Sequence, residues 1–164
     1  MATFQVPSRL QFEEILSWLK REQEEDYDGF YCKKDMLVEA FYDSQMHCVL
    51  SEGKAVGFDI YSLLSTGASI DIFEIHPLHR RKRLGTQLAR ATIEHLFELG
   101  VAQVAVNCTP ASSATFWRAL GFTERANVPH MVGEAVRLIM SRQSYSFNAT
   151  VTCRGGNPAP SGAR

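Results

Sequence analysis

Near its start the chain carries two groups of apolar positions at the 3.6-residue spacing of an amphipathic helix. The first group is Phe12, Ile15, Leu16 and Leu19, and the second is Met36, Leu37, Ala40 and Phe41. Ser8 stands where a cap of the first helix is expected, and Asp35 has the same place before the second. The pattern therefore predicts two helices, the first of them ended by the acidic run at residues 22–28.

Segments rich in apolar and β-branched residues surround these helices and predict strands. They are residues 3–6, 47–50, 55–63 and 69–75. Short turns join the last three, one containing Gly53 and the other Gly67. Short glycine-containing turns are typical of hairpins, so we expect consecutive antiparallel strands in this half of the chain.

The most regular helical stripe lies in the second half of the chain. Its apolar positions are Leu84, Leu88, Ala91, His95 or Leu96, and Leu99. Gly100 is a good C-terminal stop, and residues 101–108 read as the next strand. Because a strand, a helix and a strand follow one another, we expect strands 69–75 and 101–108 to be parallel, with a right-handed connection. A short helix at 110–120 and a final strand at 135–140 complete the pattern.

The composition changes after residue 141, where glycine and proline become frequent. We therefore expect one domain over residues 1–141, and a C-terminal tail over 142–164 that is flexible or adds one edge strand. The edge strand is suggested by alternation, with apolar residues at Tyr145, Phe147, Ala149, Val151 and Cys153.

Composition and charge exclude several classes of protein. The 164 residues are 45% hydrophobic and 21% charged, with a net charge of −1, which gives no general attraction to nucleic acid or an anionic membrane. No apolar run is long enough to span a membrane. The four cysteines are widely spaced and form no C-x-x-C pair, which predicts free thiols in a reducing cytoplasm and no metal centre.

One short segment combines a strand with concentrated positive charge. Residues 70–75 form the end of a predicted strand, and residues 80–83 are all basic at the start of the long helix. The first N–H groups of a helix have no helical partner, so this arrangement predicts a phosphate site. A solvated helix start and a nucleic-acid patch are the alternatives, whereas the glycine patterns of Rossmann and P-loop sites are absent.

The same segment resembles a known family. Residues 80–85 read Arg-Arg-Lys-Arg-Leu-Gly, which fits the Q/R-x-x-G-x-G/A motif of the GNAT superfamily of N-acetyltransferases except for Arg83 at the middle glycine. The later FW-x-x-x-GF signature ends at Phe122, and the resemblance covers roughly residues 3–141. We expect Arg83 to lie within the helix, where no positive φ is required.

The resemblance implies an α/β chain with the GNAT fold, a mixed twisted central sheet with helices on both faces and diverging parallel strands around the cofactor. It implies an enzyme that moves the acetyl group of acetyl-CoA directly to a primary amine. The strand backbone would bind the pantetheine arm, and the basic loop would bind the pyrophosphate. The cofactor-binding residues carried over from the family are Phe73, Glu74, Ile75, Arg80, Arg81, Lys82, Arg83, Leu84, Gly85 and Thr86.

The general base is expected on the central strand. Glu74 is the first candidate and Asp71 and His76 are weaker ones, since a half-buried carboxylate suits this role. Ile70 and Ile72 are expected to share one face of the strand, which would put Asp71 on the other. The alternatives are that Glu74 pairs with an arginine and that His76 only caps a turn.

Two positions depart from the residues that the family commonly uses. Trp117 replaces the usual tyrosine acid, and Pro110 replaces a common asparagine. They motivate an alternative function, a non-catalytic acyl-CoA-binding regulatory module. Cys108 reads as a buried thiol rather than a nucleophile, and Phe116 with Trp117 as core and pocket wall.

The acceptor amine is not identified by the sequence. The acidic residues from Glu22 to Gly29 are expected in a loop on the acceptor side, where they would favour a cationic amine such as a polyamine or an aminoglycoside; a solvated acidic surface is the alternative. Small-molecule and peptide amines both stay open, as does a homodimer, and no membrane or nucleic-acid partner is expected.

Overall fold

The computed structural model describes residues 1–26, 29–124 and 136–146. Its strands are β1 (Thr3–Gln5), β2 (Met46–Ser51), β3 (Lys54–Leu64), β4 (Gly67–Ile75), β5 (Gln103–Cys108), β6 (Thr123–Glu124) and β7 (Val136–Ser141). Its α-helices are α1 (Arg9–Asp26), α2 (Lys34–Tyr42), α3 (Leu84–Glu98) and α4 (Ala114–Ala119), and its 3-10 helices are η1 (Phe30–Lys33), η2 (Pro77–His79) and η3 (Ala111–Ser113). The strands form one sheet in the order β1-β2-β3-β4-β5-β7-β6.

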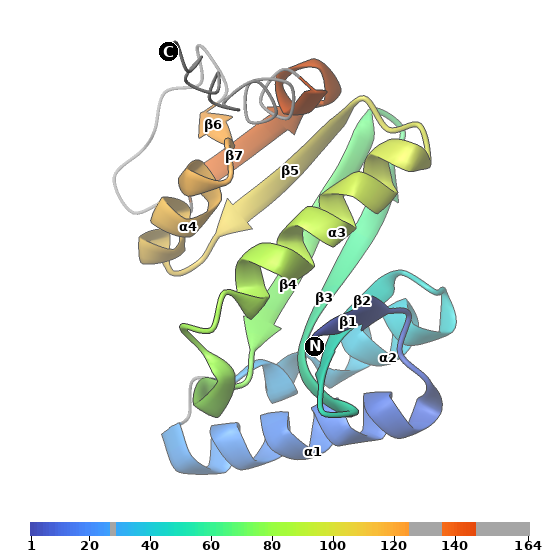
Figure 1. Cartoon of the computed structure of the whole chain (residues 1–164), viewed down its shortest axis with the longest axis vertical. Helices are drawn as coiled ribbons and strands as arrows, with labels where there is room; N and C mark the ends of the chain where they lie inside the picture. Colours follow the sequence, from blue (N-terminus) through green and yellow to red (C-terminus); the bar gives the residue numbers. More distant parts are fainter. Residues whose placement is uncertain (27–28, 125–135, 147–164) are drawn as a thin grey trace, which may run out of the picture.

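The sheet is mixed, and its parallel part is very short. β1 to β4 pair antiparallel in sequence order, as expected, and β5 pairs antiparallel with β7. β4 and β5 run parallel, but they pair only from Ala68 to Ile70 against Val104 to Val106. Beyond these three pairs β4 stays with β3 and β5 stays with β7, so the two strands diverge (Figure 1). The predicted diverging parallel strands are confirmed.

Helices cover both faces of this sheet (Figure 1). On one face α1 and α2 pack on the sheet through a cluster that includes Ile15, Leu19, Leu37, Phe58 and Ile72. On the other face α3 and α4 share a cluster with β5 and β7, which includes Ile70, Ile93, Leu96, Trp117 and Leu138. The three helical stripes predicted from the spacing of apolar residues therefore contribute to the core, except that Met36 of the second and Leu99 of the third are exposed.

A β-bulge in β4 makes one expectation wrong. Ile60 pairs with Ile72 and Tyr61 pairs with Ile70, so Asp71 is an extra residue on β4. The extra residue interrupts the alternation of side chains. Ile72 therefore joins the core under α1 and α2, and Ile70 joins the core under α3. The two isoleucines do not share a face.

The helix α1 begins as predicted but ends later. The Ser8 hydroxyl accepts a hydrogen bond from the Gln11 N–H at 3.3 Å, and the Gln11 side chain accepts one from the Ser8 N–H at 2.8 Å. This reciprocal pair is a capping box. The helix continues through Asp26, so most of the acidic run is helical and not a loop; Asp28 lies outside the described residues. Glutamate and glutamine are good helix formers, so negative charge alone does not end the helix.

The second helix begins differently from the expectation. The short helix η1 leads directly into α2, and Lys33 occupies the cap position without a side-chain hydrogen bond. Asp35 lies in the first turn of α2, where its charge favours the helix dipole without capping it. The prediction of Asp35 as the cap was wrong.

The end of α3 contacts the last described residues. Gly100 has a φ of 92° and its N–H bonds the Phe97 carbonyl, which confirms it as the helix stop. Residues 142–146 are helical, and the Tyr145 hydroxyl donates to Glu94 on α3 at 2.6 Å. Tyr145 therefore does not begin an edge strand, and the rest of the predicted tail, residues 147–164, lies outside the described residues. Among the described residues, none of the helices has the length and apolar content needed to cross a bilayer.

Candidate active site

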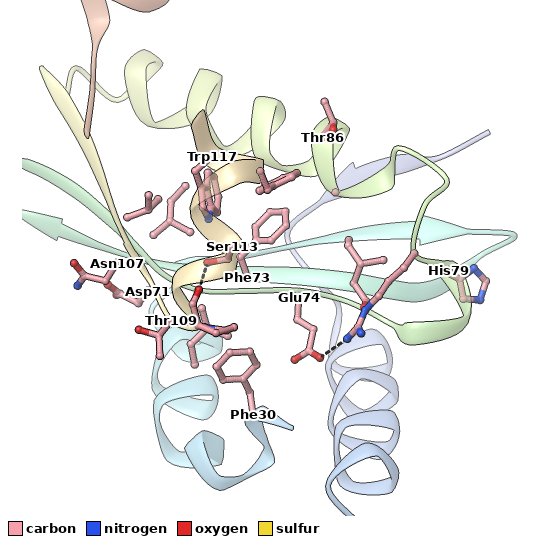
Figure 2. Close-up of a pocket in the computed structure, with 18 of the residues that line it drawn as sticks. Phe30, Asp71, Phe73, Glu74, His79, Thr86, Asn107, Thr109, Ser113 and Trp117 are labelled. Atoms are coloured by element: carbon pink, nitrogen blue, oxygen red, sulfur yellow. Dashed lines mark hydrogen bonds and ion pairs between the residues drawn. The ribbon is translucent and has the colours of Figure 1, made fainter. Parts of the chain in front are cut away.

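A cleft of about 1120 Å³ opens where β4 and β5 diverge (Figure 2). The outer half of β4 forms one wall, and the end of β5 with the start of α4 forms the other. The loop into α3 closes one end with arginine side chains, and Glu22 of α1 reaches the cleft from below the sheet. Three parts of the chain that are distant in the sequence thus meet at one opening: α1, β4 with the loop that follows it, and β5 with α4.

The basic end of the cleft, at the start of α3, has the geometry expected of an anion site. Arg83 caps α3 without a side-chain hydrogen bond, so the first N–H groups of the helix, including those of Gly85 and Thr86, have no helical partner. Arg81 and Arg83 both have a φ of 62°, which costs a non-glycine residue about 1 kcal/mol. The expectation that Arg83 needs no positive φ was wrong, because it is the residue before the helix and turns the chain into it.

Most of the expected cofactor-binding residues line this cleft. The lining includes Phe73, Glu74, Ile75, Arg80, Arg81, Arg83, Gly85 and Thr86. Leu84 and Lys82 are not part of the lining: Leu84 is buried in a core cluster with Leu88, and Lys82 is exposed. A Cβ added to Gly85 would lie 3.5 Å from Ile75 and 3.7 Å from Phe73, so glycine keeps this part of the cleft open.

Glu74 of β4 lines the cleft near Glu22 of α1, and its side chain is only 8% exposed. Its Oε1 lies 3.3 Å from Nη2 of Arg80, and the same nitrogen lies 3.2 Å from Oε1 of Glu22. Arg80 also donates from Nε to the Ile75 carbonyl at 2.9 Å. Arg80 therefore holds two carboxyl groups from different elements, which confirms the pairing of Glu74 with an arginine.

The surroundings of Glu74 strongly favour its protonated form. The pKa of Glu74 is raised to about 8, first by burial and then by the nearby Glu22, against the opposing effect of Arg80. The second carboxyl oxygen of each glutamate is buried without a hydrogen-bond partner. A carboxyl group in this state can exchange a proton near neutral pH, as a general base must.

The two weaker candidates for the base lie in different places. Asp71 lines the cleft but is exposed, and its carboxylate accepts a hydrogen bond from Ser62 at 2.5 Å. His76 lies outside the lining: its Nδ1 accepts the Leu78 N–H at 3.2 Å, and burial lowers its pKa. The turn-capping interpretation of His76 is confirmed. The histidine that lines the cleft is His79, which the sequence pattern did not single out (Figure 2).

The other end of the cleft has an aromatic wall. The rings of Phe73 and Trp117 lie 5.2 Å apart, and Phe116 lies 5.0 Å from Trp117. Trp117 is 5% exposed and belongs to both the core and the lining, which confirms it as core and pocket wall. Cys108 is buried beside this wall, and burial raises the pKa of its thiol, so it is not a ready nucleophile.

Polar groups at the end of β5 were missed by the sequence analysis. Asn107 and Thr109 line the cleft, and Ser113 donates to the Pro110 carbonyl at 2.8 Å (Figure 2). The available signal is their position, because they directly follow a buried strand whose end forms the rim of an open α/β sheet.

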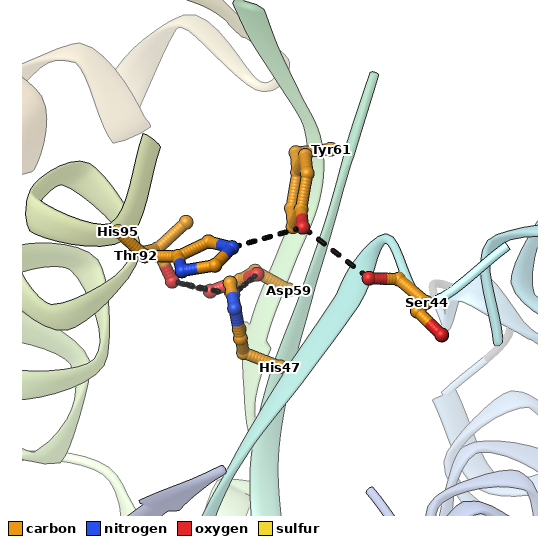
Figure 3. A network of polar contacts seen from close by, with 6 residues as sticks. All are labelled: Ser44, His47, Asp59, Tyr61, Thr92 and His95. Atoms are coloured by element: carbon orange, nitrogen blue, oxygen red, sulfur yellow. Dashed lines mark hydrogen bonds and ion pairs between the residues drawn. The ribbon is translucent and has the colours of Figure 1, made fainter. Parts of the chain in front are cut away.

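A second buried polar cluster lies between the sheet and α3, outside the cleft (Figure 3). Asp59 of β3 is 0% exposed; its Oδ1 lies 3.3 Å from Nδ1 of His47, and its Oδ2 accepts from the Thr92 hydroxyl. The Tyr61 hydroxyl donates to the Ser44 carbonyl at 3.3 Å, and His95 stands beside it at 3.4 Å. In the described part of the chain no group of acidic, histidine or cysteine side chains is arranged to hold a metal ion.

Comparison with known proteins gives the same picture at the level of family and fold. The sequence model of the acetyltransferase (GNAT) family matches residues 10–122. No curated protein sequence matches this one significantly.

Solved structures with a similar fold include three bacterial or archaeal proteins. The PaiA N-acetyltransferase of Thermoplasma acidophilum in complex with coenzyme A is 14% identical, with a TM-score of 0.67, and the match covers 86% of this chain and 99% of that one. A GNAT-family acetyltransferase of Staphylococcus aureus is 13% identical, with a TM-score of 0.68 and the same coverage. Ard1 of Thermoplasma volcanium is 18% identical, with a TM-score of 0.65 and coverage of 85% and 97%. At these identities the likeness concerns the fold.

Proposed function

Because this chain belongs to the acetyltransferase (GNAT) family, we propose that it moves the acetyl group of acetyl-CoA directly to a primary amine, with Glu74 as the general base. The observation that carries this proposal is the single cleft in which a buried carboxyl group and an anion-binding helix start face one another. The two features supply what the reaction needs, which is a proton acceptor and a binding site for the phosphate groups of the acetyl donor.

The proposed donor site uses the free edge of β4. Beyond Ile70 this strand has no β5 partner, so its peptide groups can pair with the amide groups of an extended pantetheine arm. At the far end the N–H groups of Gly85 and Thr86 and the side chains of Arg81 and Arg83 would bind the pyrophosphate. Acetyl-CoA supplies the activated acetyl group at this site.

The proposed chemistry follows from the position of Glu74. With a pKa of about 8, its carboxylate accepts a proton from the acceptor amine as the amine attacks the thioester carbonyl. Backbone N–H groups of β4 would stabilise the negative charge that develops on the carbonyl oxygen. Trp117 replaces the family's tyrosine acid, but a thiol has an ordinary pKa of about 8.5 and leaves readily as a thiolate.

The acceptor enters from the side of α1 in this proposal. Glu22, Glu74 and Asp71 give that side three carboxyl groups, and Phe30 adds an aromatic surface. Asp71 is exposed, and Glu22 and Glu74 share the single charge of Arg80, so we expect this side to favour a cationic amine, such as a polyamine, over an acidic one. The described cysteines are free, and we expect the reaction in the cytoplasm.

The test is release of free thiol from acetyl-CoA with a panel of primary amines. We expect steady turnover with at least one cationic amine, and a loss of about 10²- to 10⁴-fold in turnover for Glu74→Gln with cofactor affinity preserved, because the variant keeps its shape but cannot accept a proton. Glu25→Gln, an exposed position on the same acidic run, is the matched control.

Two outcomes would contradict the proposal. Acetyl-CoA binding without turnover for any amine would support the alternative, an acyl-CoA-binding regulatory module, which Trp117 at the acid position favours. Turnover that Glu74→Gln leaves unchanged between pH 6 and 9 would move the base elsewhere in the cleft.

A further inference from the structure

Two carboxyl groups in this cleft bind the same arginine. Glu22 comes from the last turns of α1 and Glu74 from the end of β4, and both side chains are strongly buried, 12% and 8% exposed. Each offers one oxygen to the same nitrogen of Arg80, at 3.2 Å for Glu22 and 3.3 Å for Glu74. Two buried carboxylates that share one nitrogen repel one another, and a proton on one of them removes this repulsion.

The local charges agree with one retained proton. Arg80 is the only guanidinium that bonds this pair in the described structure, and a single positive charge cannot balance two buried carboxylates. Two like charges in contact cannot both ionise easily, as in other paired carboxyl groups. The remaining oxygens of Glu22 and Glu74 are buried and unpartnered, so no other donor in the described residues takes the place of that proton.

We propose that Glu22 and Glu74 hold one proton between them and act as a single acid–base unit, in which Glu22 is a positioning residue that controls the protonation of Glu74. This inference rests on the proposed function for its catalytic part, but the shared proton itself does not. The other charged or titratable side chains that line the cleft around the pair are Asp71, His79, Arg81 and Arg83.

The proton balance of the reaction fits such a unit. An acceptor ammonium carries three protons on nitrogen and the amide product carries one. One proton leaves to solvent before attack. As the N–C bond forms and the C–S bond breaks, the ionised pair takes the second proton and returns it to the departing thiolate. The pair thereby takes over the proton delivery for which Trp117 is unsuited.

The first experiment is infrared spectroscopy of the protein at pH 7, in three variants besides the wild type. A protonated carboxyl group has a C=O band that carboxylates lack, and nearly all other carboxyl groups are ionised at this pH. We expect the band in the wild type and in the control Glu25→Gln. It should be missing from Glu74→Gln and weaker in Glu22→Gln, where Glu74 stays buried but no longer lies beside a second carboxyl group. A wild type without the band would overturn the proposal.

The second experiment is the pH profile of kcat/KM with the best amine of the panel. The wild-type activity should rise through a pH of about 8. In Glu22→Gln the like charge is gone and the amide can donate to Glu74, so the rise should move at least about one pH unit lower. Removing the guanidinium in Arg80→Gln should move it higher. Glu22→Asp, which keeps the charge, should stay closer to the wild type.

If Glu22 and Arg80 had only structural roles, the pH profiles of Glu22→Gln and Arg80→Gln would not be expected to move in opposite directions. If Glu22→Gln and the wild type have the same profile, Glu22 does not control Glu74, although acetyl transfer itself would stand. If no amine is acetylated but the infrared band is present, is missing from Glu74→Gln and is weaker in Glu22→Gln, the pair stands and the proposed function falls.

Discussion

Glu74 and Asp59 are buried carboxyl groups on the neighbouring strands β4 and β3, but their surroundings differ. Both oxygens of Asp59 have partners, Nδ1 of His47 and the hydroxyl of Thr92. One oxygen of Glu74 accepts a hydrogen bond from Arg80, and the other is buried with no hydrogen-bond donor in the described residues. Burial alone therefore does not distinguish the proposed general base from a carboxyl group with a structural role. The unmet hydrogen-bonding capacity, next to an open cleft, does.

The two sites also differ in what surrounds them. Asp59 lies between β3 and α3, and the His47 ring stacks on Tyr61 at 5.3 Å to close the cluster (Figure 3). Glu74 lies where β5 has already left the sheet, so the space beside it stays open. A satisfied network contributes to stability, and an incomplete one reduces it.

The largest expected effect on stability comes from Asp59→Ala. The change leaves His47 and Thr92 without their buried partner, and we expect a loss of about 3 kcal/mol in the free energy of unfolding. Urea denaturation measures it, with Asp43→Ala at an exposed position as the control. A loss below about 1 kcal/mol would mean that Asp59 is not a structural centre, and the contrast with Glu74 would fail.

Glu74→Gln should have the opposite effect on stability. The folded-state pKa of Glu74 is raised to about 8 from an ordinary value of 4.5, so its contribution to stability is full below pH 4.5 and is lost as pH rises to 8. Glutamine does not ionise, so the variant should be about 1–2 kcal/mol more stable than the wild type at pH 8. The gap should close toward pH 5. Urea denaturation at both pH values tests this. If Glu74→Gln is less stable than the wild type at pH 8, the buried carboxyl group of Glu74 does not lack hydrogen-bond donors as described.

The smallest effect concerns His95, at the edge of the Asp59 cluster. Burial and the charge of His47 lower its pKa below 6.5 in the folded state. The unfolded chain therefore binds the proton more readily, and the stability contribution falls as pH drops through 6.5. Between pH 7 and 5.5 the fall in Tm should be smaller for His95→Gln than for the wild type, by about 1–2 °C, in thermal scans. Equal falls in Tm would show that His95 is not coupled to the cluster.

The elements that form the cleft could be predicted from the sequence, since they depend on local patterns. The helical stripe from Leu84, the stop at Gly100 and the strands on either side predicted a parallel crossover, and a basic helix start predicted the anion end. The alternation rule failed at Asp71, where one extra residue shifts the rest of β4, and no local signal marks that bulge.

The carboxyl pair required more than local patterns. If α1 is continued past the acidic run, Glu22 falls on the same face as Ile15, Trp18 and Leu19, at an otherwise apolar position. That spacing was a usable signal. Asp59 was not predictable, because its partners His47 and Thr92 are 12 and 33 residues away and belong to other elements.

The three-residue pairing between β4 and β5 has a consequence for the mechanics of the whole sheet. The antiparallel strands β1 to β4 lie on one side of this pairing, and β5, β7 and β6 lie on the other. The sheet thus consists of two groups of strands that pair with one another over three residues. A molecule bound between β4 and β5, where the two strands have diverged, would contact both groups of strands and hold them at one angle. We therefore expect a molecule bound in the cleft to stabilise the arrangement of the two groups of strands, which in the described residues pair with one another only at Ala68 to Ile70.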